Sequence, residues 1–151
     1  MASNAEVVST LNRLIETCRD GQEGFQAAAE GVRDAELKEL FYGYSRERAS
    51  FAGGLQDEVR RLGGEPERTG SLAASLHRGW MGLRAALEGG DDAGVLGECL
   101  RGEDMALAEY RAALGVDLPA SVRAMVERQF AEVKKAHDHI QALAGAKGAG
   151  G

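Results

Sequence analysis

The chain has few of the residues that mark several classes of protein. Its 151 residues include two cysteines, two prolines and one tryptophan, and Lys and Arg form no basic block. No stretch reaches the roughly 20 apolar residues of a membrane span, and the N-terminus lacks the apolar run of a signal peptide. With a net charge of −6, the chain lacks the basic face that nucleic acid or an anionic membrane requires. We therefore expect a cytoplasmic protein that binds neither.

The two cysteines fall on apolar positions of helical patterns. Cys18 and Cys99 have no evident basic neighbour in the sequence, so neither is expected to be an activated nucleophile. Both fit the pattern of reduced, buried thiols. A disulfide between them stays open as an alternative, because pairing depends on geometry that spacing does not give.

Glycine and proline divide the chain into helices, and no alternating pattern of a strand competes with them. The apolar spacing predicts helices over about 4–31, 35–62, 71–88, 92–114 and 120–143. Asp34 should cap the second helix, and Asp91 or Asp92 the fourth. We expect a single domain over residues 1–144, followed by a disordered Gly/Ala-rich tail over 145–151.

The long connection between the second and fourth predicted helices favours one architecture. It spans about thirty residues and contains the predicted short helix over 71–88. Short loops would give an up-down-up-down bundle, whereas one long crossover is typical of ferritin-like bundles. The sequence therefore predicts an all-α, ferritin-like four-helix bundle with an extra short helix in the crossover between its second and third bundle helices.

Polar residues interrupt the apolar stripe of each of the four long helices: Gln22, Arg48, Glu103 and Gln129. Gln22 and Arg48 are 26 residues apart, and Glu103 and Gln129 repeat that spacing. This pattern predicts a structural polar layer across the middle of the bundle, with a buried Arg48–Glu103 ion pair. The two glutamines, helped by the hydroxyl of Tyr44 or Tyr110, would satisfy the remaining donors and acceptors.

Several segments resemble an uncharacterised family of ferritin-like four-helix-bundle proteins known from bacteria. They are LNRLIETCRDGQEGFQAAAE, SRERASFAGGLQDEVRRLGGEPE, LHRGWMGLRAAL, RGEDMALAEYRAAL and VERQFAEVKKAHDHI. The resemblance extends from about Val8 to Ile140. It implies the bundle fold and no reaction, because the family is classed as a domain of unknown function.

A di-iron or di-manganese carboxylate site is the alternative that this fold suggests. Such a site takes one Glu from each of two helices and Glu-x-x-His from each of the other two. The best match pairs Glu16 with Glu47-x-x-Ser50, and Glu103 with Lys134-x-x-His137. Ser50 then replaces a histidine and Lys134 replaces a carboxylate, and Glu16 points about 150° away from the centre of its apolar stripe. We expect no metal and no cofactor.

The histidines give weaker signals. His77 is expected to be a boundary residue of the short helix, beside Trp80. His137 and His139 flank Asp138 near the predicted end of the last helix, where positive charge complements the helix dipole. The sequence thus predicts no catalytic residues and a non-catalytic bundle acting in protein association or stress response. Its partner would be an unknown protein or a second copy of the chain. The alternative is a degenerate metal-binding oxidoreductase that uses Glu103.

Overall fold

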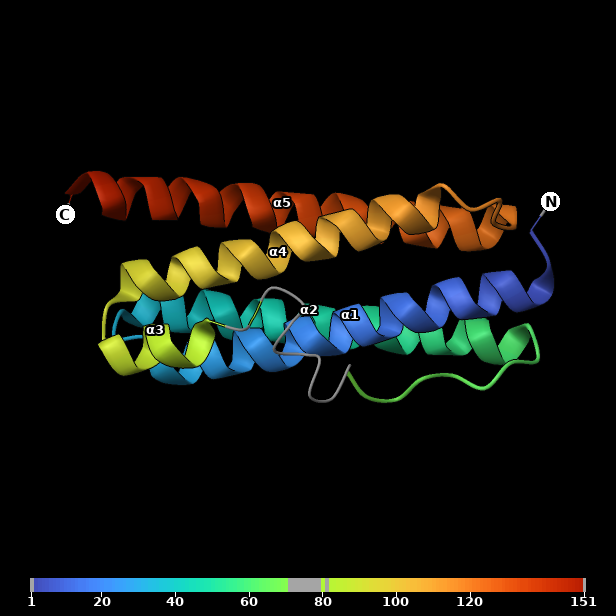
Figure 1. Ribbon diagram of the computed structural model, residues 1–151, viewed down its shortest axis with the longest axis horizontal. Coiled ribbons are helices and arrows are strands. Elements are labelled where there is room, and N and C mark those ends of the chain that lie inside the picture. Colours follow the sequence, from blue (N-terminus) through green and yellow to red (C-terminus); the bar gives the residue numbers. More distant parts are fainter. Residues whose placement is uncertain (1, 71–79, 81, 151) are drawn as a thin grey trace.

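The computed structural model describes residues 2–70, 80 and 82–150, and every regular element in them is a helix. The helices are α1 (Asn4–Gly31), α2 (Ala35–Arg61), α3 (Leu83–Gly89), α4 (Asp92–Leu114) and α5 (Ala120–Gly150). Four of them are long and lie side by side, and α3 is short (Figure 1). The all-helical prediction is confirmed for the described part of the chain. None of the described helices is long and apolar enough to cross a membrane.

The ends of α1 and α2 agree with the sequence signals. Ser3 precedes α1, and its hydroxyl accepts a hydrogen bond from the backbone N–H of Glu6. The Asp34 carboxylate accepts the N–H groups of Glu36 and Leu37, which confirms Asp34 as the N-cap of α2. α2 ends just before Gly63, whose φ of 79° is a left-handed conformation that favours glycine.

The loop before α4 resolves a choice that the sequence left open. Asp91 is the N-cap of α4, and its carboxylate accepts the N–H of Ala93. The carboxylate of Asp92 instead accepts the N–H groups of Arg33 and Asp34, which tie the α1–α2 loop to the start of α4. Most of the predicted short helix, residues 71–79 with Ser71 and His77, lies outside the described residues. The structure has α3 from Leu83 to Gly89.

The C-terminal helix is longer than predicted. α5 runs to Gly150 and so includes residues 145–150, for which the sequence predicts disorder. The segment has no proline, and its alanines have the highest helix propensity of all residues, which offsets the glycines between them. His137 and His139 therefore lie well before the end of α5, and the dipole explanation for them is wrong, because that effect is confined to the last turn.

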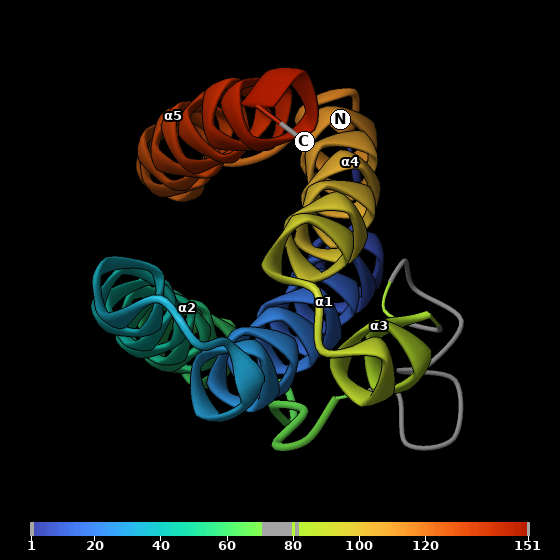
Figure 2. The same ribbon diagram turned by 90° about the vertical axis from the view of Figure 1, so that its left-hand side faces the viewer.

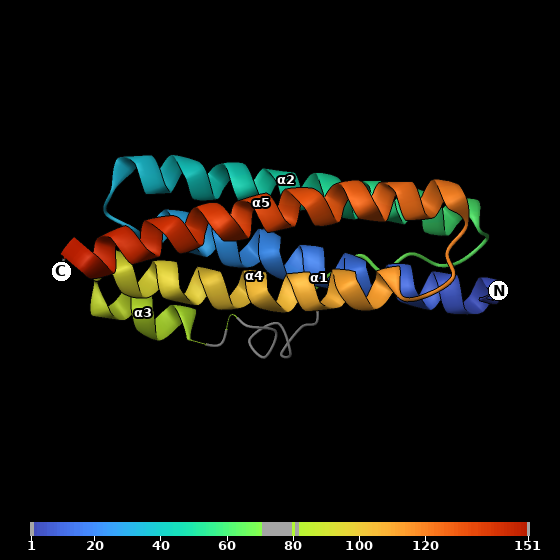
Figure 3. The ribbon, with the colours of Figure 1, turned by 90° about the horizontal axis from the view of Figure 1, so that it is seen from above.

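The long helices are arranged in the order α2, α1, α4, α5 around an open curve (Figure 2). α1 packs against both α2 and α4, and α4 packs against α5. α3 lies outside α1 and α4, on the side away from the opening (Figure 2). α2 and α5 approach each other at few positions. Seen from above, α5 is inclined, with its N-terminal part toward α2 and its C-terminal part toward α4 (Figure 3).

This arrangement leaves one side of the predicted core less covered than expected. Leu40, Tyr44 and Phe51 of α2 and Met125 of α5 belong to the predicted apolar stripes, yet they are only half-buried. The stripes themselves are correct, but α2 and α5 stand too far apart for their side chains to cover one another fully.

The interior consists of two hydrophobic clusters along the length of the bundle. The first includes Leu11, Ile15, Leu55, Leu107 and Val126, among others. The second includes Phe25, Phe41, Trp80, Leu96 and Ile140. Arg48 lies between the parts of α2 that belong to the two clusters, and Glu103 lies between the corresponding parts of α4. Two charged side chains therefore occupy the middle of the interior.

Trp80 fits a notch made by two glycines. A Cβ atom at Gly102 of α4 would lie 2.3 Å from Cε2 of Trp80, and one at Gly24 of α1 would lie 2.5 Å from its Cδ2. The indole therefore occupies space that any larger residue at either position would fill. Its ring also meets the ring of Phe25 edge-on, with centroids 5.0 Å apart.

The notch predicts opposite effects of two glycine-to-alanine changes in α4. Gly102→Ala should lower the free energy of unfolding by about 1–3 kcal/mol, because the new methyl group overlaps the indole. Gly97→Ala is the control, since a Cβ there would meet nothing within 4 Å. It should raise the free energy of unfolding by up to about 1 kcal/mol, because alanine has the higher helix propensity. Urea unfolding followed by fluorescence of the single tryptophan measures both. Equal effects of the two changes would contradict the notch.

Candidate functional site

The centre of the bundle holds a bidentate ion pair. Nη1 of Arg48 donates to Oε1 of Glu103 at 2.6 Å, and Nη2 donates to Oε2 at 2.5 Å. Arg48 is 1% exposed and Glu103 is fully buried. The two parallel hydrogen bonds match the planar guanidinium to the planar carboxylate, which is the strongest geometry for this pair. The structure thus brings together the two charged residues of the predicted polar layer.

The surroundings of Arg48 are shaped for its side chain. A Cβ atom at Gly21 would lie 3.4 Å from both Cγ and Nη1 of Arg48, so glycine leaves just enough room. The ring of Phe25 lies 5.4 Å from the guanidinium carbon, within the range of a cation–π interaction. Among the described residues, Nε of Arg48 has no hydrogen-bond partner. Glu103 thus provides the main compensation for burying the positive charge.

Electrostatics keep Arg48 ionised. Burial disfavours the charge on Arg48, but the nearby carboxylate of Glu103 outweighs that penalty and raises the pKa of Arg48 above its ordinary value. Arginine does not lose its proton in proteins. A fixed positive charge therefore sits at the centre of the bundle.

A second, neutral chain of hydrogen bonds lies beside the ion pair. The Tyr110 hydroxyl donates to Oε1 of Gln129 at 2.7 Å and lies 3.2 Å from Sγ of Cys18. Nε2 of Gln129 donates to the carbonyl of Phe51 at 3.3 Å. Burial raises the pKa of Cys18 to about 11 and that of Tyr110 well above its ordinary value. Both groups therefore stay protonated at neutral pH. The two cysteines are free, and no disulfide joins them.

The two predicted glutamines do not touch the ion pair. Gln22 is half-buried, and its Oε1 accepts from Nη1 of Arg19 at 2.6 Å. Its neighbour Gly21 faces Arg48 instead, because one residue turns a helix by about 100°. Gln129 is buried but belongs to the Tyr110 chain. The prediction that both glutamines complete the pair is therefore wrong. The contribution of Cys18 was missed, although its position one turn before Gln22 was a signal.

The other residues of the hypothetical metal site point elsewhere. His137 bonds the carboxylate of Asp104 through Nε2 at 2.7 Å and that of Asp138 through Nδ1 at 3.0 Å. Lys134 pairs with Asp138 on the outside of α5. Over the described ranges, no three His, Cys, Asp or Glu side chains form a group that could hold a metal ion.

Glu47 is the remaining half-buried carboxylate near the centre. Its Oε1 is buried and has no hydrogen-bond partner in the described part of the chain. Burial raises the pKa of Glu47, and the positive charge of Arg48 opposes this shift. The Tyr44 hydroxyl, one turn earlier in α2, is bonded to Nδ1 of His139 at 3.1 Å. Tyr44 therefore links α2 to α5 and does not join the ion pair.

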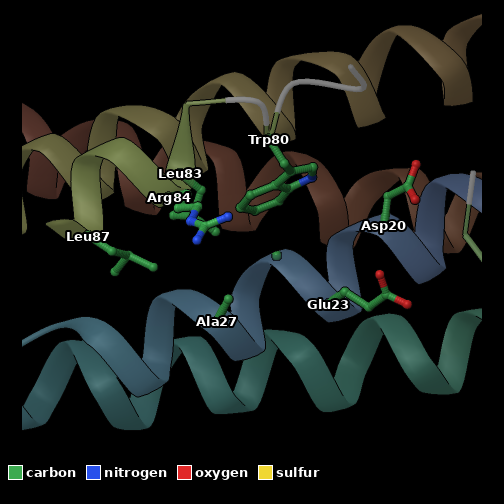
Figure 4. A pocket seen from close by; sticks show the side chains of 8 residues that line it. Asp20, Glu23, Ala27, Trp80, Leu83, Arg84 and Leu87 are labelled. Atoms are coloured by element: carbon green, nitrogen blue, oxygen red, sulfur yellow. The ribbon is translucent and has the colours of Figure 1, made fainter. Parts of the chain in front are cut away.

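A pocket of about 280 Å³ lies on the opposite side of the bundle, between α1 and α3 (Figure 4). Trp80, Leu83 and Leu87 line one wall, and Asp20, Glu23 and Ala27 of α1 line the other. Arg84 of α3 also lines the pocket (Figure 4). Because Phe25 contacts both the Trp80 ring and the Arg48 guanidinium, this pocket is separated from the ion pair.

Comparison with known families identifies the family of the chain. The family described as "Domain of unknown function (DUF2383)" matches residues 6–115. The chain belongs to this family. The part of the chain that matches DUF2383 contains α1 from its third residue, all of α2, α3 and α4, and both members of the ion pair, whereas α5 and Gln129 lie beyond it. No curated protein matches the chain.

Unfolding of core variants tests the ion pair. Arg48→Met alone should lower the free energy of unfolding by about 3–5 kcal/mol, because it leaves the Glu103 carboxylate buried without a partner. The double change with Glu103→Leu should recover most of this loss, since no charge is then stranded. Arg60→Met is the control: the exposed Arg60–Asp57 pair should contribute less than about 1 kcal/mol. A neutral Arg48→Met would contradict a buried pair.

The buried thiol of Cys18 predicts loss of stability at high pH. Its pKa rises from 9.0 to about 11 on folding. The contribution of the buried thiol to the free energy of unfolding is therefore complete below pH 9 and is lost as the pH rises toward 11. The loss should be about 2–3 kcal/mol. Cys18→Ser keeps a hydrogen-bonding group but removes the titration. Its unfolding free energy, measured by urea titration at several pH values, should therefore fall less steeply. An unchanged slope would show that Cys18 is not responsible.

Proposed function

We propose that this chain is a non-catalytic, ferritin-like bundle in which the Arg48–Glu103 pair takes the place of a metal centre, and that it serves in protein association. The direction of the helices supports the ferritin-like assignment. α2 and α4 run the same way, so the chain returns along the bundle between them (Figure 1). One long return of this kind is typical of ferritin-like folds.

The geometry of Glu103 carries the proposal of a metal-free core. A dinuclear centre in such bundles needs several carboxylates and histidines that face one point. Here both oxygens of Glu103 are bound by Arg48. A divalent cation at this point would be repelled by the guanidinium and would have to displace it from a buried position. The donor set on these helices therefore does not fit the metal centre that the fold suggests.

The chemistry of the remaining buried groups supports a non-catalytic role. The thiols of Cys18 and Cys99 have pKa values raised by burial, so neither supplies a thiolate at neutral pH. Tyr110 is likewise protonated and already donates its hydrogen bond to Gln129. Apart from Nε of Arg48, the polar side-chain atoms of the ion pair and of the Tyr110 chain are hydrogen-bonded within the described part of the core, as a structural layer requires.

The open side of the bundle supports the association role. α2 and α5 stand apart there, and apolar residues of both helices remain half-buried (Figure 2). Apolar surface that a chain does not cover by itself is a common feature of protein-binding surfaces.

Metal content tests the metal-free core against the metal-binding alternative. The protein, produced without a histidine tag in medium containing iron and manganese, should hold close to no metal by mass spectrometry. About two equivalents per chain, as in a dinuclear bundle site, that disappear in Glu103→Ala would overturn the proposal. His137→Ala is the matched control. Metal lost in that variant and retained in Glu103→Ala would belong to the surface and would leave the proposed core intact.

A further inference from the structure

The pocket between α1 and α3 is bounded by two close contacts at glycines. Trp80 lies against Gly24, where a Cβ atom would fall 2.5 Å from Cδ2 of the indole. Leu87 lies against Gly31, where a Cβ atom would fall 2.2 Å from Cδ2 of the leucine. The two glycines are about two helical turns apart and therefore lie on one face of α1. Trp80 and α3 are thus fastened to α1 at two points, and the pocket of about 280 Å³ occupies the interval between them.

The wall of the pocket between these contacts is apolar. Ala27 lies on the same face of α1 as Gly24 and Gly31 and presents no more than a methyl group. Leu83 and Leu87 of α3 line the opposite side. Ala27 and Leu87 stay half-buried, although both pack against the second hydrophobic cluster. A concave site with uncovered apolar side chains and a few polar groups is typical of small-molecule sites.

The three charged side chains that line the pocket differ in their partners. Asp20 is buried and has contacts of its own. Arg84 is exposed, and its Nε lies 3.4 Å from Oε1 of Glu88. Glu23 is exposed and has neither a hydrogen bond nor an ion pair to any described residue. The unpaired charge of the pocket is therefore negative. Figure 4 shows both carboxylates at one end of the pocket and α3 at the other.

This arrangement selects a ligand with a short apolar body and one positive charge. Since ligand pockets commonly measure about 300–1,000 Å³, this pocket suits a small molecule. A carboxylate ligand would be repelled by Glu23, whereas an ammonium group would be attracted to it. We propose that the pocket binds a small amphipathic amine, with its hydrocarbon part between Ala27 and Leu87 and its ammonium group beside Glu23. This site goes beyond the association role and uses neither the ion pair nor the open side of the bundle.

Three probes of equal chain length test the proposed ligand class: hexylamine, hexan-1-ol and hexanoate. Trp80 lines the pocket and is the single tryptophan of the chain, so its fluorescence reports binding. Hexylamine should change the emission saturably and bind about fivefold more tightly than hexan-1-ol, the size of an exposed ion pair. Hexanoate should bind most weakly. Calorimetry should give one hexylamine per chain. No binding of hexylamine, or equal binding of the three probes, would overturn the proposal.

Filling the pocket tests its location. Ala27→Leu should weaken hexylamine binding at least about tenfold, because the larger side chain occupies the space of the hydrocarbon part. Ala108→Leu is the matched control: it makes the same change at an exposed position of α4 and should bind hexylamine like the unaltered chain. Circular dichroism checks that both variants keep their helices. Hexylamine that binds Ala27→Leu with unchanged affinity would lie outside the pocket.

Removing the unpaired charge tests the role of Glu23. Glu23→Gln alters an exposed side chain, so the fold should be kept. The affinity for hexylamine should fall to that for hexan-1-ol, and hexan-1-ol itself should bind as before. Glu6→Gln removes the same charge from the first turn of α1, roughly 25 Å away along the helix, and should leave the preference for the amine intact. A preference that survives Glu23→Gln would contradict the proposed role.

The outcomes separate this inference from the proposed function. The metal-free core is tested by metal content, and none of the binding measurements concerns it. Two equivalents of metal in a chain that binds hexylamine as described would overturn the core assignment and leave the amine site standing. Conversely, a metal-free chain that does not bind hexylamine would overturn the amine site alone.

Discussion

The structure depends on one contact, the pair of hydrogen bonds between Arg48 and Glu103. This contact joins α2 to α4, and thereby the α1–α2 hairpin to the α4–α5 hairpin. It lies between two hydrophobic clusters that could each tolerate some rearrangement. Sliding α2 by one turn, about 5.4 Å, would separate the two charges and bury both without a partner. The cost of such stranded charges is several kcal/mol. The ion pair therefore disfavours a shift of α2 against α4 along the bundle.

The two sides of the bundle are closed in different ways around this pair. On the α3 side, Trp80 occupies the notch made by Gly24 and Gly102 and touches Phe25, which in turn contacts Arg48. The connection between α2 and α4 is therefore fastened close to the ion pair. On the other side, two hydrogen bonds cross from α2 to α5 within the described residues, Tyr44 to His139 and Gln129 to the Phe51 carbonyl. The apolar side chains of α2 and α5 on the second side stay half-buried, and the proposed association role rests on them.

The helices and the ion pair follow from local sequence signals, whereas the open side does not. Asp34 begins α2 through its side-chain carboxylate, and Gly63 follows its end in a left-handed conformation, so the roles of both are visible in the sequence alone. The inward direction of Arg48 and Glu103 follows from helical period. Gln22 was misplaced because Gly21, its neighbour about 100° away around the helix, is the residue that faces Arg48. The separation of α2 and α5 depends on distances between helices, which periodicity does not contain.

The ion pair and the open side of the bundle differ in the helices that form them. The segment that matches the family, residues 6–115, contains Arg48 and Glu103 but ends before α5. Both charged residues of the ion pair therefore lie on helices within the family segment. The open side, in contrast, is formed only where α5 is present and inclined toward α2 (Figure 3). A Cβ atom at Gly43 of α2 would meet no atom of the ion pair, so a substitution there changes the surface of the bundle without disturbing the buried charges.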